Sequence, residues 1–232
     1  LVGEPWRPAE ALAAAGVVPP AAPVRVAVAA GPAFSFRYEE NLELLRAAGA
    51  GVLEFDPLAS RALPEGADGL LLGGGFPEAF AGELCDAGTL REAVRAFAAA
   101  GHPVAAECGG MLFLCRELDG RAMCGVIDAS ARMTDGLTLG YREAEAPADS
   151  ALARSGWRLR GHEFHYSSAE PAAGRAPAWR LETAGGSRAE GFVQGGVHAS
   201  YLHTHWAATP EVAARFVASA GGAGRRPERR AA

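Results

Sequence analysis

A short apolar run that ends in Glu107-Cys108-Gly109-Gly110 constrains the fold of this chain more than any other stretch. An apolar pattern with helical spacing follows it, so the segment from 102 to 115 is predicted to be a strand, a sharp turn and a helix. A cysteine on such a turn projects its sulfur into solvent above the sheet edge, and the two glycines let the backbone turn and leave N–H groups free. Those N–H groups favour a thiolate and a developing oxyanion. Cys108 is therefore a candidate nucleophile; the alternative is that it is a small buried hydrophobe, as free cysteines often are.

The elements before this turn alternate between strands and helices. Strands are predicted at 24–30, 51–55 and 69–72, and helices at 37–48 and 90–100. This order predicts an α/β fold of three layers, with a mostly parallel sheet covered on both faces and ligands bound at the carboxyl ends of its strands.

Composition excludes several classes of function. The 232 residues are 49% hydrophobic, and no apolar run reaches the roughly 18 residues of a membrane helix, so a soluble cytoplasmic protein is expected. A net charge of -5 gives no reason to expect nucleic acid as a partner. The four cysteines (85, 108, 115 and 124) form no Cys-x-x-Cys motif, which argues against a disulfide framework or structural zinc. All 22 basic residues are Arg, so the chain has no lysine for a P-loop or a Schiff base.

The two ends differ in composition from the middle. Residues 1–22 are interpreted as a short helix (8–15) and a linker, the remnant of a connection in a longer protein. Residues 23–220 form the predicted domain, which closes with a helix over 210–220. Residues 221–232 are expected to be a disordered, Arg-rich tail.

Three glycines at 73–75 follow the third predicted strand. They lack the register of a phosphate-binding loop, so close backbone approach is the better interpretation. If this loop lies beside Cys108, its N–H groups and that of Gly109 would form an oxyanion hole. A plain flexible turn is the alternative.

The region after Leu118 changes character. Residues 123–143 are predicted to be β-rich, with turns at Asp135-Gly136 and at Gly140. A strand then carries Gly161-His-Glu-Phe-His-Tyr-Ser167, in which alternation places His162 and Phe164 on one face and Glu163 and His165 on the other. Because the two histidines face opposite ways, a metal site is not expected, and a polar rim to an active site is the preferred interpretation.

A hairpin is predicted over 191–201, and His203 and His205 follow it. A lone histidine is more often structural. A histidine at a strand end that meets a cysteine on a turn, however, is what thiol acyl transfer requires, because the imidazole takes the thiol proton and returns it to the leaving amine.

These motifs together resemble one family. Glu107-Cys-Gly-Gly-Met, Gly73-Gly-Gly-Phe-Pro-Glu, Gly161-His-Glu-Phe-His-Tyr-Ser and Ala199-Ser-Tyr-Leu-His-Thr-His are similar to the glutamine amidotransferase domain of cobyrinic or hydrogenobyrinic acid a,c-diamide synthases, over about residues 24–218. The resemblance implies a class I amidotransferase fold (flavodoxin-like), release of ammonia from glutamine, and ATP-dependent amidation of the a and c carboxylates of a corrinoid. It also implies that ATP and Mg²⁺ bind to a separate N-terminal domain, with no cofactor or metal in this chain.

The resemblance assigns roles to individual residues. Cys108 corresponds to the nucleophile and His203 to the base, while Gly74 or Gly75 with Gly109 would form the oxyanion hole. His205 stands where many relatives have a glutamate, so either His205 or a more distant acid such as Glu107 would orient His203. Substrate-rim candidates are His162, Glu163, His165 and Tyr201.

Two alternatives remain open at this point. A paralogue such as cobyric acid synthase, or a cell-wall amidating subunit, would use the same cysteine and histidine on another acceptor. A non-catalytic module would show no thiol reactivity. Ala30-Gly31-Pro32 replaces a basic residue and an aspartate that are usual in the resembled family, which bears on synthase activity more than on glutamine hydrolysis. A homodimer is also left open.

Overall fold

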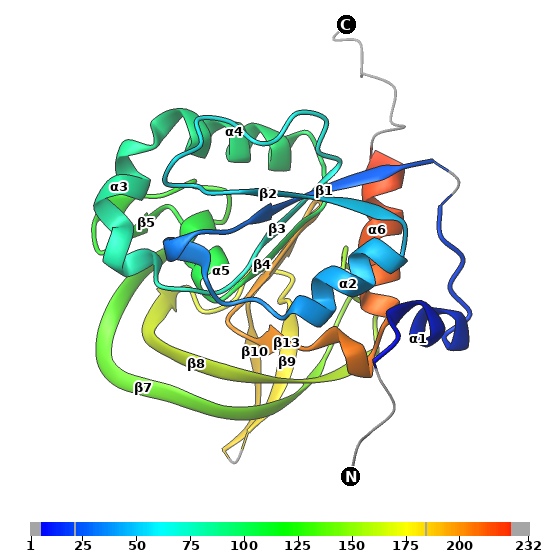
Figure 1. Cartoon of the computed structure of the whole chain (residues 1–232). Coiled ribbons are helices and arrows are strands. Elements are labelled where there is room, and N and C mark those ends of the chain that lie inside the picture. Colours follow the sequence, from blue (N-terminus) through cyan, green and yellow to red (C-terminus); the bar gives the residue numbers. More distant parts are fainter. Residues whose placement is uncertain (1–5, 21, 184, 224–232) are drawn as a thin grey trace, which may run out of the picture.

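The computed structural model describes residues 6–20, 22–183 and 185–223. Its first sheet has six strands in the order β11-β12-β4-β3-β1-β2, of which only β11 is antiparallel to its neighbour (Figure 1). The strands are β1 (Val24–Ala29), β2 (Ala50–Phe55), β3 (Gly69–Leu72), β4 (Val104–Glu107), β11 (Phe192–Gln194) and β12 (Val197–Ser200). The predicted α/β class and mostly parallel sheet are confirmed.

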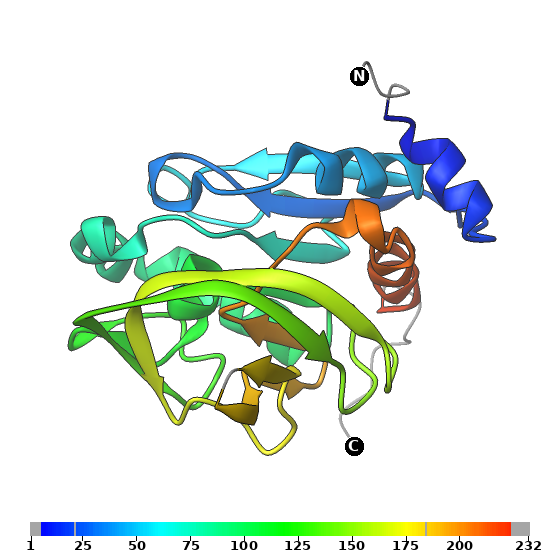
Figure 2. The same cartoon turned by 90° about the horizontal axis from the view of Figure 1, so that it is seen from below.

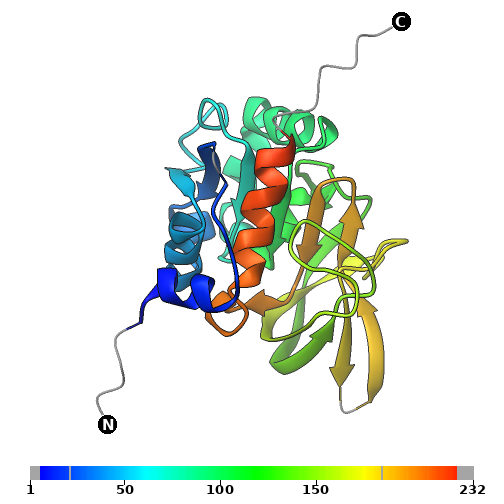
Figure 3. The ribbon, with the colours of Figure 1, turned by 90° about the vertical axis from the view of Figure 1, so that its right-hand side faces the viewer.

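Helices or a second sheet bury both faces of a mostly parallel sheet, so its strands carry apolar side chains on both faces. In β1, Val26 and Val28 face one core cluster, and Ala27 and Ala29 face another. Helices α2 (Glu39–Ala47) and α6 (Glu211–Ala223) cover the first face; α3 (Ala81–Asp86), α4 (Gly88–Ala99) and α5 (Gly109–Leu114) cover the second. Figure 3 shows α6 lying along the first face beside α2.

A second sheet packs beside the first (Figure 2). Its longest strands are an antiparallel pair, β7 (Ser130–Glu145) and β8 (Arg158–Glu170), and the others are β5 (Glu117–Leu118), β6 (Arg121–Ala122), β9 (Trp179–Thr183), β10 (Gly186–Glu190) and β13 (His203–Thr204). The predicted turn at Gly140 is wrong, because Gly140 pairs with Glu163 of β8 within the strand. Asp135-Gly136 falls in an irregularity of β7, where the register against β8 shifts between Met133 and Thr138.

The termini of the described chain are helical. Helix α1 (Pro8–Ala14) confirms the predicted helix, but Leu12 is buried in the core with α2, so this helix packs against the domain. Helix α6 extends to Ala223. The predicted disordered tail is therefore wrong for residues 221–223, while 224–232 lie outside the described residues. Three short 3₁₀ helices, Pro32–Phe34, Pro77–Phe80 and Trp206–Ala208, complete the connections. Within the described ranges, no helix is long and apolar enough to cross a membrane.

Gly110 is required by the contact between α5 and β3. A Cβ atom at this position would lie 2.2 Å from the carbonyl oxygen of Leu72, which is backbone and cannot move aside. Replacing Gly110 by alanine should lower the free energy of unfolding by about 1–3 kcal/mol or more, the range for overpacking a core. Urea denaturation would measure this loss. Gly222→Ala is the matched control, since a Cβ there meets no atom within 4 Å; equal stability of the two variants would contradict the steric argument.

Candidate active site

Cys108 occupies the turn between β4 and α5, as the sequence predicts. Its backbone lies at φ 47° and ψ −104°, a conformation that side chains rarely adopt and that persists only where surrounding contacts impose it. Its N–H donates to the carbonyl oxygen of Ser200 at 2.7 Å, which ties the turn to β12. A Cβ atom on Gly109 would lie 2.9 Å from Pro77 Cδ and 3.1 Å from the Gly75 nitrogen. The glycine loop and the cysteine turn are therefore in contact.

The sulfur of Cys108 is buried, not exposed above the sheet edge. The residue is 6% exposed, and its Sγ lies 3.9 Å from the carbonyl oxygen of Phe164 on β8. Burial raises the pKa of the thiol to about 12, and the nearby carboxylates of Glu78, Glu107 and Glu190 raise it further, whereas the Gly109 N–H lowers it. The expectation of a low-pKa thiolate is wrong, because desolvation by the second sheet outweighs one hydrogen-bond donor.

A protonated resting thiol has a pH signature. A raised pKa means that the thiolate fraction of Cys108 grows about tenfold per pH unit and keeps growing above pH 9. We expect the rate of alkylation of Cys108 by iodoacetamide to rise steadily from pH 7 to pH 10, as followed by peptide mass spectrometry. A plateau below pH 8 would contradict the burial argument.

His203 stands on β13, which pairs with β8 so that His203 is directly opposite His162. The two imidazole rings stack with centroids 4.9 Å apart and 15° between their planes, and Phe36 contacts His203 edge-on at 4.8 Å. A Cβ atom on Gly74 would lie 2.4 Å from His203 Cε1. Gly74 thus leaves room for the imidazole, whereas Gly75 lines the same cavity as Cys108 and His203.

Glu107 lies behind His203. Its Oε1 accepts hydrogen bonds from the N–H of Thr204 at 3.1 Å and from its hydroxyl at 2.6 Å, and its Oε2 lies 3.9 Å from His203 Nδ1. Burial raises the pKa of Glu107 to about 7, against the effect of the two Thr204 hydrogen bonds, and burial lowers the pKa of His203 to about 3. His203 is therefore neutral at physiological pH, with a carboxyl group beyond hydrogen-bond distance of its Nδ1.

His205 does not accompany His203. Its Nε2 lies 3.4 Å from Glu40 Oε2, and its ring packs edge-on against Tyr38, away from the cavity. The two histidines do not share one side of an extended segment, because β13 ends at Thr204 and a 3₁₀ helix begins at Trp206. Asn41 fixes this change of direction by accepting the N–H of Trp206 and donating to the Thr204 carbonyl oxygen.

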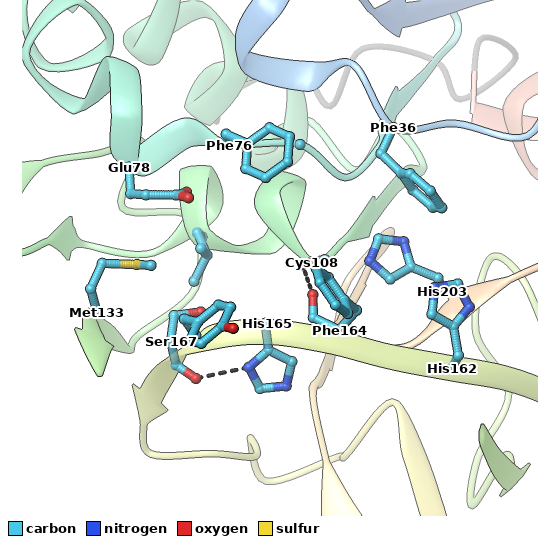
Figure 4. A pocket seen from close by; sticks show the side chains of 13 residues that line it. Phe36, Phe76, Glu78, Cys108, Met133, His162, Phe164, His165, Ser167 and His203 are labelled. Carbon is cyan, nitrogen blue, oxygen red and sulfur yellow. Dashed lines mark hydrogen bonds between the residues drawn. The ribbon is translucent and has the colours of Figure 1, made fainter. Parts of the chain in front are cut away.

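The four rim candidates divide into two pairs. His162 and His165 line the cavity, as Figure 4 shows. Glu163 is fully buried and does not line the cavity, and Arg142 and Arg188 donate hydrogen bonds to it. Burial raises its pKa, but hydrogen bonds from His165 and the two arginines lower it to about 2. Glu163 is thus an internal ion-pair partner, and its assignment to the rim is wrong.

Tyr201 is the second candidate that does not reach the cavity. Its ring stacks on that of His165 at 3.8 Å, and its hydroxyl accepts a hydrogen bond from Ser167 at 3.1 Å. Tyr201 is 5% exposed and does not line the cavity, so it supports the ring of His165 from the side away from the cavity.

The cavity itself has a volume of about 210 Å³ and a largely aromatic wall. Its aromatic residues are Phe36, Phe76, Phe164 and Tyr166, none of which the sequence motifs predict as site residues. Phe164 had one available signal, its place on the same strand face as His162. In the part of the chain that the structure describes, no three His, Cys, Asp or Glu side chains are grouped to hold a metal ion.

Comparisons with known proteins agree with this architecture. A family model for a CobB/CobQ-like glutamine amidotransferase domain matches residues 25–211. The chain is 62% identical over 193 residues to the hydrogenobyrinate a,c-diamide synthase of Streptomyces coelicolor and 55% identical over 199 residues to that of Mycobacterium tuberculosis. It is 47% identical over 203 residues to the cobyrinate a,c-diamide synthase of Gloeobacter violaceus. These alignments cover 83–85% of this chain but only 40–44% of the relatives, so the chain spans less than half of their length.

Solved structures share the fold. A glutamine amidotransferase superimposes with a TM-score of 0.56 at 20% identity, over 84% of this chain and 98% of that one. PurLQS from Thermotoga maritima gives 0.57 at 12% identity, over 86% and 98%. The fold, with a cysteine on its strand-to-helix turn, is that of a class I glutamine amidotransferase. Within that class, the chain belongs to the CobB/CobQ-like glutamine amidotransferase domain family.

Proposed function

We propose that this domain hydrolyses L-glutamine to glutamate and ammonia, with Cys108 as the nucleophile and His203 as the general base. The observation that carries the proposal is that both side chains line one cavity at the carboxyl ends of the parallel strands, although they are 95 positions apart in the chain. The strained backbone of Cys108 supports it as well, because such strain concentrates at reactive sites.

The resting pair is neutral, so proton transfer accompanies attack. His203 takes the thiol proton as the sulfur bonds to the amide carbon, and the amide oxygen becomes an oxyanion beside the N–H groups of Gly75 and Gly109. The imidazolium then returns the proton to the leaving ammonia. Water, deprotonated by His203, cleaves the thioester and restores the thiol, and glutamate leaves.

We propose Glu107 as the group that orients His203. Its carboxylate faces Nδ1, which favours a proton on Nδ1 and leaves Nε2 free to accept the proton from Cys108. The separation of 3.9 Å requires a small approach of the two groups when substrate binds. His205, with Glu40 and Tyr38 as neighbours, has no such role.

We further propose that the ammonia amidates the a and c carboxylates of a corrinoid, in an ATP-dependent reaction of a longer protein. ATP and Mg²⁺ do not fit the cavity of this domain, since its aromatic wall contains no arginine to bind phosphate. They are assigned to the part that the relatives possess beyond the aligned region. Higher identity to relatives named for hydrogenobyrinate than to those named for cobyrinate favours the cobalt-free acceptor.

Two assays test these proposals separately. Purified chain should release glutamate from L-glutamine without ATP, which tests the hydrolysis alone. A polypeptide that joins this domain to the remaining part of the synthase should consume ATP and form diamide with hydrogenobyrinate faster than with cobyrinate. Hydrolysis without amidation of either corrinoid would overturn the acceptor and leave the glutaminase chemistry intact.

A further inference from the structure

Glu78 is a carboxylate that the proposed chemistry does not use. It lies in the 3₁₀ helix Pro77–Phe80, directly after the glycine loop, and it lines the cavity on the side of Cys108 opposite His203 (Figure 4). Among the residues that the structure describes, no arginine or histidine forms an ion pair with it. Half-burial raises the pKa of Glu78, and Asp119 nearby raises it further. This end of the cavity therefore presents uncompensated negative charge.

The rest of the wall offers no competing charge at that end. At that end, Met133 and Phe76 contribute apolar side chains and Ser167 contributes an uncharged hydroxyl group (Figure 4). A charged group that enters this end loses water, and only attraction to the carboxylate of Glu78 offsets that loss, so a cation is favoured over an anion.

The geometry of the substrate matches this arrangement. When the amide carbon of an amino-acid amide meets Cys108, with its oxygen beside Gly75 and Gly109, the rest of the molecule must extend away from the imidazole. His203, His162 and Phe36 close the other side. In glutamine, two methylene groups then lead to a carbon that carries one ammonium and one carboxylate group. The end occupied by Glu78 suits the ammonium.

We propose that Glu78 binds the α-ammonium group of the substrate and so makes the domain selective for amides that carry a free α-amino group. The inference rests on the proposed glutaminase function and adds a specificity-determining residue to it. Because no arginine lines the cavity, the α-carboxylate contributes less to selection than the ammonium does.

Substrate analogues test this directly. The wild type should hydrolyse L-glutamine with a kcat/KM about 10- to 100-fold higher than that for glutaramate, which lacks only the amino group; this is the range for a hydrogen bond to a charged group. Glu78→Gln should reduce that preference to a few-fold, mainly by raising KM for glutamine, because glutaramate carries no ammonium group for Glu78 to bind. L-Glutamine methyl ester, which lacks the carboxylate charge, should remain a good substrate of the wild type. Glu83→Gln, an exposed carboxylate on α3, is the matched control.

Selectivity for the ammonium group and hydrolysis itself can fail independently. If Glu78→Gln keeps the full preference for glutamine, or loses both substrates equally, Glu78 does not read the ammonium group, while hydrolysis by the wild type still stands. If the wild type hydrolyses neither substrate, the labelling rate of Cys108 by chloroketone analogues with and without the α-amino group gives the same comparison. Equal rates for the two analogues in the wild type would overturn the assignment.

Discussion

Replacing Cys108 by alanine should abolish glutamine hydrolysis, with a loss of at least about 10³-fold in kcat. The thioester route needs the sulfur, and without it water would have to attack the amide of glutamine directly, which is less reactive than a thioester. Measuring glutamate release by the purified variant checks this, with circular dichroism to confirm that the domain is folded.

The other cysteines supply the control for this variant. Cys115 is fully buried, its Sγ lies 3.5 Å from the Met111 carbonyl oxygen, and it does not line the cavity. Cys115→Ala should therefore keep a turnover number close to that of the wild type, even if the domain loses some stability. Substantial hydrolysis by Cys108→Ala would require another nucleophile and would overturn the proposed mechanism.

Replacing His203 by alanine should lower kcat for glutamine hydrolysis by roughly 10²- to 10⁴-fold, the range for loss of a positioned general base. Without the imidazole, attack depends on the small fraction of Cys108 present as thiolate, because burial raises the thiol pKa to about 12. The residual rate of this variant should therefore increase with pH across pH 7 to 10, in contrast to the wild type. Initial rates over that range measure both effects.

Two further variants decide how His203 is oriented. Glu107→Gln should lower kcat by more than His205→Ala does, since an amide facing Nδ1 can donate to it and favour the wrong tautomer. His205→Ala should remain within a few-fold of the wild type, because its partners are Glu40 and Tyr38. A larger loss in His205→Ala than in Glu107→Gln would assign the orienting role to His205 after all.

The turn at Cys108 and the faces of β8 could be predicted from the sequence, because short-range patterns of glycine and apolar residues determine them. The turn at Cys108 follows from two glycines after an apolar run, and a Cβ at Gly110 would indeed collide with β3. The alternation along 161–167 correctly placed Glu163 and His165 on one face of β8. Alternation does not reveal which face of a strand another layer will cover. It therefore cannot show that Glu163 is buried against Arg142 and Arg188 rather than lying at the rim.

What could not be predicted depends on long-range packing. The burial of Cys108 arises from Phe164, 56 positions later, and no local pattern shows that β8 crosses above the turn. The path of the chain after His203 depends on Asn41, whose side chain holds the Trp206 N–H and ends β13 after two residues. Alternation assigns faces only while a strand continues, so it does not apply at His205.

The two hydrogen bonds from Thr204 to Glu107 join strands of different sheets, since β4 belongs to the first and β13 to the second. The sulfur of Cys108 is positioned by one layer and the imidazole of His203 by the other. A slight sliding of the layers would therefore separate the reacting atoms while every strand stayed paired. The rate of glutamine hydrolysis therefore depends on the alignment of the two layers. In a denaturant titration it should be lost at lower denaturant concentrations than the helical circular dichroism signal.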